Sequence, residues 1–193
     1  MVAVSLEAFA VSTGVVALGE MGDKTQLLSL LLAARYRRPW PIMAGILVAT
    51  LLNHGAASVL GTWLTQWVDP QWMRWLLGAS FIAVAAWMLV PDEAGEVQGH
   101  SSGRWGLFGL TVVAFFLAEM GYKTQIATIM LAARYNEWWV VTAGTTLGMM
   151  LANVPAVLLG DKVVQWVPIV WVHRIAALVF AAIGVAVLLG AGG

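Results

Sequence analysis

Two short polar motifs of nearly the same sequence interrupt apolar stretches of the chain. The first reads Glu-Met-Gly-Asp-Lys-Thr-Gln at residues 20–26, and the second reads Glu-Met-Gly-Tyr-Lys-Thr-Gln at residues 119–125, 99 positions later. Each motif continues to an Ala-Ala-Arg-Tyr segment, at 33–36 and 132–135. Charged residues at bilayer depth are costly and mark ion pathways, proton relays or substrate sites. Two such motifs in corresponding halves of a repeated chain predict a transport site between the halves.

The residue types in the first motif predict the chemistry of such a site. If this segment is helical, Glu20, Asp23 and Lys24 share one face, and Gln26 follows Asp23 by the same spacing. Carboxylate, amide and hydroxyl oxygens are the preferred ligands of hard cations such as Ca²⁺, Mg²⁺ and Mn²⁺. Softer ions favour thiolate or imidazole, and neither group occurs in the two motifs. The motif therefore predicts a site for a hard divalent cation.

An inverted repeat would bring the second motif opposite the first across a pseudo-two-fold axis. Glu119 would then face Glu20 and Asp23. Hydroxyl and amide oxygens from both motifs are expected to complete the ligand shell: Thr25, Thr124, Gln26 and Gln125.

The charges of the motifs allow two interpretations. The carboxylates of Glu20, Asp23 and Glu119 sum to −3 and Lys24 and Lys123 add +2, so the pair of motifs carries −1. Either the lysines balance the carboxylates when the site is empty, or a carboxyl takes up a proton, because burial favours its neutral form. In the second case protons and cations compete for the same oxygens, which couples their fluxes. Apart from both interpretations of a transport site, these charges could serve only as structural ion pairs between helices, which the presence of two motifs disfavours.

The composition indicates a membrane protein. The chain is 61% hydrophobic and 10% charged, with a mean hydropathy of +0.84, whereas a soluble domain carries about a quarter charged residues. The net charge is zero and no basic run is present, which argues against binding to nucleic acid. Cysteine is absent, which excludes disulfides and cysteine nucleophiles. No histidine pair at ligand spacing or cofactor motif supports an enzyme.

We predict an all-α membrane protein with six transmembrane helices arranged as two inverted three-helix repeats. A spanning helix needs about 20 apolar residues. Segments near this length lie at 5–34, 40–63, 71–90, 104–133, 138–160 and 168–190. The first and fourth contain the motifs and are expected to be tilted or broken near Gly22 and Gly121. A polar linker at 91–104 separates the first repeat, 1–90, from the second, 105–193.

Aromatic and basic residues predict the placement of these helices in the bilayer. Of eleven tryptophans, all but Trp87 fall near a predicted helix end, as in interfacial aromatic belts. Arg74 and Arg134 are expected on one side. The other side collects Arg35, Arg37, Arg38, Arg104, Lys162 and Arg174. The positive-inside rule places this second side and the linker in the cytoplasm, with both termini outside.

The paired motifs, over nearly the whole chain, resemble the Gdt1 family of cation transporters, also called UPF0016. The resemblance implies transport of divalent cations, chiefly Mn²⁺ and in some members Ca²⁺, in exchange for protons. It implies that the family's acidic positions are Glu20, Asp23 and Glu119. Bacterial members of this size resemble Mn²⁺ exporters of the inner membrane, which implies a lipid environment and no cofactor beside the transported cation. Assembly into a homo-oligomer stays open.

Two other functions also stay open. A distant kinship with the lysine-exporter superfamily implies export of a small solute such as an amino acid. A passive cation channel would use the same acidic ring without a closed intermediate.

One residue departs from the family pattern, which has aspartate where this chain has Tyr122. Tyrosine is bulky, neutral at physiological pH and a weaker ligand for a hard cation. An aspartate there would bring the net charge of the two motifs to −2, which matches one divalent cation. We therefore predict that Tyr122 weakens transport.

Three further polar residues lie within predicted helices. Asn53, His54 and Asn153 fit either a second shell or proton path beside the site, or hydrogen bonds between helices. For His54 we favour the hydrogen bond, because no second histidine lies at ligand spacing.

Overall fold

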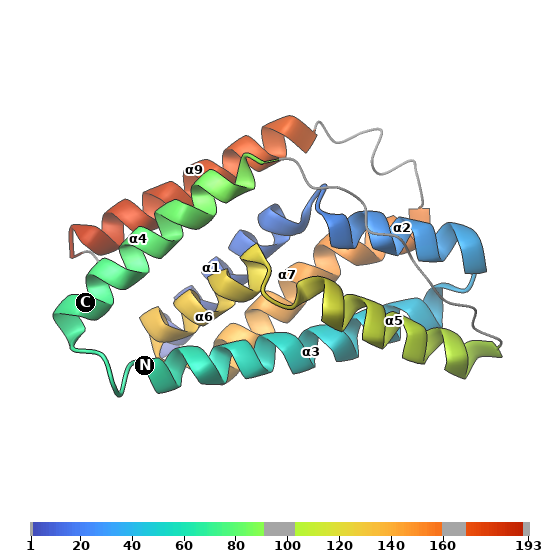
Figure 1. Ribbon diagram of the computed structural model, residues 1–193, viewed down its shortest axis with the longest axis horizontal. Coiled ribbons are helices and arrows are strands. Elements are labelled where there is room, and N and C mark those ends of the chain that lie inside the picture. The colour runs from blue at the N-terminus through green and yellow to red at the C-terminus, as the bar shows by residue number, and fades with distance from the viewer. Residues whose placement is uncertain (1, 91–102, 160–168, 191–193) are drawn as a thin grey trace.

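The computed structural model describes residues 2–90, 103–159 and 169–190, and these ranges form eight α-helices (Figure 1). The helices are α1 (Val2–Glu20), α2 (Lys24–Tyr36), α3 (Pro39–Leu64), α4 (Pro70–Met88), α5 (Gly103–Glu119), α6 (Lys123–Tyr135), α7 (Trp138–Leu159) and α9 (Ile169–Leu188). The predicted all-α class is confirmed. Most of the predicted linker at 91–104 lies outside the described residues.

Three helices are long and apolar enough to cross a membrane: α3, α7 and, from Val170, α9. Two further candidates are bent helix pairs. α1 and α2 meet at 67° and α5 and α6 meet at 72°, so the described residues contain up to five candidate spans. α4 is not among them, since Gln71 and Arg74 lower the hydropathy of its first turns. By this criterion the described residues contain three of the six expected spans, or five if each bent pair crosses the membrane as one span.

Glycine explains where the two bent pairs break. Gly22 has a φ of 81° and Gly121 a φ of 72°. This left-handed region costs glycine nothing, because glycine has no Cβ atom. Each glycine lies two residues after the end of one helix and two residues before the start of the next. The predicted breaks near both glycines are confirmed.

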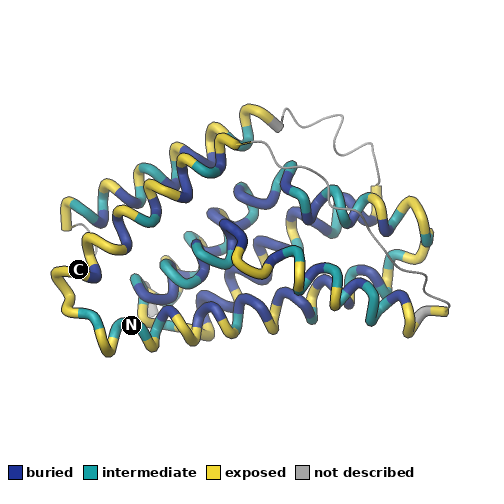
Figure 2. The backbone as a smooth tube through the Cα atoms, in the orientation of Figure 1, coloured by how far each residue is buried: buried dark blue, intermediate teal, exposed yellow. Residues whose placement is uncertain are grey.

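The long helices α3 and α7 pack against each other and together contact most of the other helices, with α3 along the lower edge of the view in Figure 1. α7 packs against α1, α2 and α3, and α3 packs in turn against α5 and α6. α4 and α9 lie side by side along one face, where Phe81 and Phe180 pack with ring centroids 6.1 Å apart. The exposed residues of this pair follow its outer surface in Figure 2. The helices on both sides of the first break therefore pack against α7, and those on both sides of the second break pack against α3.

Tryptophan side chains cover the outside of the helices. Nine of them are between 49% and 77% exposed, which suits anchors at a lipid headgroup layer. They are Trp40, Trp63, Trp67, Trp72, Trp75, Trp105, Trp138, Trp139 and Trp171. Trp87, which the sequence already set apart, instead contacts the second motif.

Gly61 controls the distance between α3 and α6. A Cβ atom at Gly61 would lie 2.2 Å from the carbonyl oxygen of Ile129 and 2.9 Å from the Cβ atom of Ala132. We expect Gly61→Ala to lower the free energy of unfolding by about 1–3 kcal/mol through overpacking. Gly109→Ala on α5 is the matched control, because a Cβ there meets no atom within 4 Å. Thermal unfolding in detergent checks this, and equal midpoints for the two variants would contradict it.

Candidate functional site

The two breaks carry four fully buried charged side chains into the protein. The exposed fraction is 0% for Glu20, Asp23 and Lys123 and 1% for Glu119. Ionisable groups buried in apolar spans are expensive and mark functional sites. The structure thus buries all three carboxylates that the sequence predicted as cation ligands.

The two motif glutamates have the same hydrogen-bond arrangement. The Thr25 hydroxyl donates to Oε2 of Glu20, and the Thr124 hydroxyl donates to Oε2 of Glu119 at 2.6 Å. Oε1 of each glutamate is buried and has no hydrogen-bond partner among the described residues. Leaving a buried polar atom unsatisfied costs about 1–3 kcal/mol, and more for a charged group. Each glutamate therefore has one oriented oxygen and one oxygen available for a cation or a proton.

The motif glutamines hold the breaks in place. Oε1 of Gln26 accepts a hydrogen bond from the Gly22 N–H at 2.8 Å, and Oε1 of Gln125 accepts one from the Gly121 N–H at 2.6 Å. These bonds satisfy backbone groups that the broken helices leave without intrahelical partners. Coordination of a cation by either amide oxygen would compete with this bond.

The same glutamines reach across to the other half of the chain. Nε2 of Gln26 donates to the carbonyl oxygen of Ala152 at 2.8 Å, and Nε2 of Gln125 donates to Oδ1 of Asn53 at 2.6 Å. Positions 53 and 152 are 99 residues apart, which equals the separation of the motifs. Each motif is therefore hydrogen-bonded to the long helix of the opposite half, the first motif to α7 and the second to α3.

Asn53, Asn153 and His54 have different environments. Asn53 also donates to the Phe116 carbonyl at 3.3 Å, and Asn153 accepts a hydrogen bond from Ser29 at 2.6 Å. These two residues form hydrogen bonds between helices, which was one of the two interpretations of these positions from the sequence. The interpretation of His54 as an interhelical hydrogen-bond residue is wrong for the described part of the chain, where neither ring nitrogen has a partner.

Tyr122 bridges the two motifs. Its hydroxyl donates to Oδ1 of Asp23 at 2.8 Å. The ammonium group of Lys24 lies 3.4 Å from the centroid of the Tyr122 ring, within cation–π range. The rings of Trp87 on α4 and Tyr122 meet edge-on, with their centroids 5.6 Å apart. Tyr122 is only 8% exposed, so its ring is buried where it joins the two breaks.

Asp23 also begins a helix. Its Oδ1 accepts a hydrogen bond from the Lys24 N–H at 2.6 Å, which makes Asp23 the N-cap of α2. Tyr122 occupies the equivalent position before α6 and forms no side-chain cap. The sequence signal for this second role of Asp23 was an aspartate directly before an apolar helical run.

The carboxylates share one buried region without forming a tight cluster. In the described ranges, no group of three or more aspartate, glutamate or histidine side chains stands close enough together to hold a metal ion. Glu20 and Glu119 are oriented by their own threonines, while Asp23 is bonded to Tyr122. A shared cation would require these groups to approach each other.

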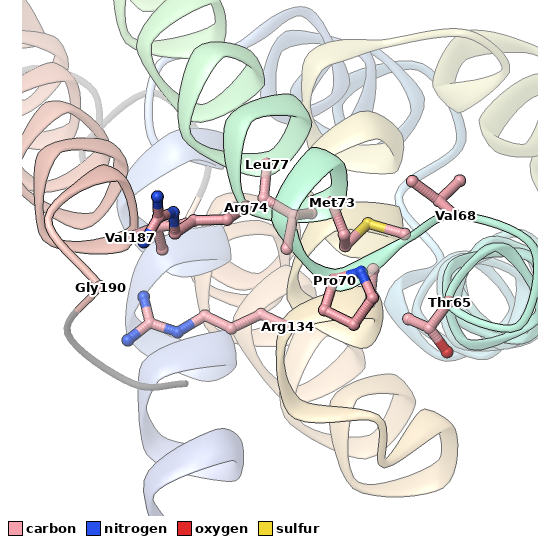
Figure 3. Close-up of a pocket in the computed structure, with 10 residues that line it drawn as sticks. Thr65, Val68, Pro70, Met73, Arg74, Leu77, Arg134, Val187 and Gly190 are labelled. Carbon is pink, nitrogen blue, oxygen red and sulfur yellow. The ribbon is translucent and has the colours of Figure 1, made fainter.

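A separate pocket of about 300 Å³ lies at the end of α6 (Figure 3). Arg74 and Arg134 both extend toward Gly190 at its wall. Two guanidinium groups disfavour a cation, so this pocket does not fit the predicted cation site. Its geometry does bring together the two arginines that the sequence assigned to one side.

Comparison with known proteins finds a single family for both halves. The model of the family described as "Divalent cation/proton antiporter GDT1" matches residues 8–96 and 107–193. A Vibrio cholerae protein named "Putative manganese exporter" is 46% identical over 177 residues, which cover 91% of this chain and 87% of that protein. No solved structure matches the chain.

More distant relatives come from photosynthetic organisms. A GDT1-like protein of Synechocystis is 29% identical over 181 residues, covering 82% of this chain and 85% of that protein. A chloroplastic GDT1-like protein of Oryza sativa is 25% identical over 207 residues, covering 89% of this chain and 58% of that protein.

Proposed function

The chain belongs to the GDT1 family of divalent cation/proton antiporters, and from this premise we propose that it exports Mn²⁺ in exchange for protons. Membership makes it a membrane transport protein and not an enzyme. The manganese assignment is supported by the Vibrio relative, whose name describes manganese export. Hard oxygen ligands, without cysteine or histidine in the motifs, are compatible with this ion.

One observation carries the proposed mechanism: each motif glutamate has a buried carboxylate oxygen with no hydrogen-bond partner among the described residues. In the proposed cycle, Mn²⁺ binds between these oxygens of Glu20 and Glu119, and Asp23 joins them. Thr25 and Thr124 orient the two glutamates, and Lys24 and Lys123 adjust the local charge. Protons then take the place of the cation on the same carboxylates, so that each species displaces the other.

We further propose six spans in two inverted three-helix repeats, 1–90 and 105–193, with α4 as the sixth span. The corresponding contacts of Gln26 and Gln125 with opposite halves support this arrangement. Binding sites at the interface of such repeats open alternately as one repeat moves against the other. We place the protein in the inner membrane, and the distribution of arginines supports an orientation with both termini outside.

Uptake of Mn²⁺ into proteoliposomes with an imposed pH gradient tests the proposal. We expect accumulation against the Mn²⁺ gradient when the pH gradient is present, and its loss when an ionophore dissipates the pH gradient. Parallel assays with Ca²⁺ and with amino acids measure the preference for substrate. Flux that a pH gradient cannot drive uphill would favour a passive channel, and amino-acid flux without Mn²⁺ flux would favour solute export.

Competition between protons and cations predicts a pH dependence of binding. Ligating carboxylates must be deprotonated, so the apparent affinity for Mn²⁺ should rise with pH. The slope should approach about tenfold per pH unit for each proton that the cation displaces. Titration calorimetry of the protein in detergent at several pH values measures this slope. An affinity independent of pH between about 5.5 and 8 would contradict exchange at shared carboxylates.

A further inference from the structure

α3 carries three buried polar side chains in successive turns. Thr50, His54 and Ser58 are 1%, 0% and 0% exposed. The hydroxyl oxygens of Thr50 and Ser58 and both ring nitrogens of His54 have no hydrogen-bond partner among the described residues. The hydroxyl of Thr146, on the neighbouring α7, is likewise buried without a described partner. These groups stand outside the set of cation ligands, and the cycle proposed above does not use them.

Unsatisfied hydroxyls are not a general feature of this protein's helices. The hydroxyls of Thr111, Thr128 and Thr145 each donate at 2.8 Å to the carbonyl oxygen four residues earlier. Thr50, Ser58 and Thr146 have the same backbone option and do not use it. Each buried polar atom left without a bond costs about 1–3 kcal/mol. Several such atoms in one region indicate ordered water, which typically bonds two to four otherwise unsatisfied groups.

The contacts of α3 place the polar stripe formed by Thr50, His54 and Ser58 beside both α6 and α7. Gly61 meets the backbone of α6 at Ile129, and Gly55 lies against the methyl group of Thr142 on α7. Thr146 follows Thr142 by one helical turn. The three α3 residues are spaced by four positions, so they share one face over about 12 Å.

The stripe also reaches the level of the second motif. Asn53, the chain neighbour of His54, accepts the hydrogen bond from Gln125. The titratable groups of α5 and α6 near this level are Glu119 and Lys123, both buried at the break. The described residues of α7 contain no titratable side chain.

We propose that Thr50, His54, Ser58 and Thr146 line a hydrated track that carries protons to and from the second motif, separately from the path of the cation. The assignment of protons rests on the proposed exchange, whereas the hydration of the track does not. Hydroxyl and imidazole groups can each donate and accept hydrogen bonds, so together with water they form a continuous relay. These four side chains carry no negative charge to compensate a divalent cation that loses its hydration shell, so we assign the track to protons and not to Mn²⁺.

Cysteine labelling tests the hydration. The chain has no cysteine, so Thr50→Cys, Ser58→Cys and Thr146→Cys each introduce a single thiol of similar size. Thr111→Cys and Thr145→Cys are matched controls, since both native hydroxyls are satisfied by the backbone. Reaction requires the thiolate and access to water, so 2-aminoethyl methanethiosulfonate should modify the track at least about tenfold faster than the controls. Equal rates at the two sets would overturn the hydrated track.

Transport by His54 variants tests the passage of protons. We expect His54→Leu to reduce pH-gradient-driven Mn²⁺ accumulation at least about tenfold, while its Mn²⁺ affinity by calorimetry stays within about twofold of the parent. His54→Gln, which can still donate and accept hydrogen bonds, should retain more of the accumulation. Parental transport in His54→Leu would overturn the proton route. Absence of driven transport in the parent would instead reject the proposed exchange, and labelling would still decide the hydration.

Discussion

Glu119→Gln should eliminate Mn²⁺ accumulation driven by a pH gradient, and Glu20→Gln should do the same. The amide keeps the size of the side chain and can still accept the hydrogen bond from Thr124 or Thr25. It removes the negative charge and the ability to bind a proton, which are the two properties that exchange needs. Loss of a second-shell partner alone costs about 10- to 100-fold in metal affinity or activity. Loss of a direct ligand should cost at least as much.

Glu7→Gln is the control for these two variants. Glu7 is an exposed carboxylate of α1 that accepts a hydrogen bond from the Tyr135 hydroxyl at 3.1 Å, so its replacement removes the same charge outside the buried site. Proteoliposome uptake and calorimetry should both separate Glu7→Gln from the motif variants. Normal binding and transport in Glu20→Gln and Glu119→Gln would show that the cation binds elsewhere.

The sequence predicted the features that depend on local residues. Glycine inside an apolar segment predicted the breaks at Gly22 and Gly121, because few other residues adopt a positive φ readily. The burial of Glu20, Asp23 and Glu119 followed from charge within a span. The single charge of α4 was harder to interpret, because Arg74 near a helix end lowers hydropathy without preventing a helix.

Contacts between distant residues could not be predicted in the same way. The bond from Tyr122 to Asp23 joins residues 99 positions apart and depends on how the two breaks meet. Trp87 was recognisable only as the tryptophan away from a predicted helix end, and its contact with Tyr122 gives that position a role. His54 looked like an ordinary interhelical residue, and only the tertiary structure shows that neither ring nitrogen finds a partner among the described residues.

Tyr122→Asp should increase both Mn²⁺ affinity and transport. In the present chain the Tyr122 hydroxyl occupies Oδ1 of Asp23, and the ring places Lys24 beside the site. Aspartate would remove this bond and change the net charge of the two motifs from −1 to −2, which balances a divalent cation. Two effects are combined in that substitution: Asp23 is released and a ligand charge is added.

Tyr122→Phe separates these effects, because it releases Asp23 while retaining the ring under Lys24. A hydrogen bond to a charged group contributes about 1.5–3 kcal/mol, so release alone should raise the affinity by roughly 10- to 150-fold. Calorimetry and uptake assays of the two variants and the parent then show how much the release of Asp23 and the added charge each contribute to Mn²⁺ affinity and transport. If Tyr122→Phe matches Tyr122→Asp, tyrosine acts mainly by holding Asp23; if only Tyr122→Asp improves binding, the missing charge is decisive. Unchanged affinity and flux in Tyr122→Asp would remove position 122 from the transport site, and the buried bridge would then only join the two breaks.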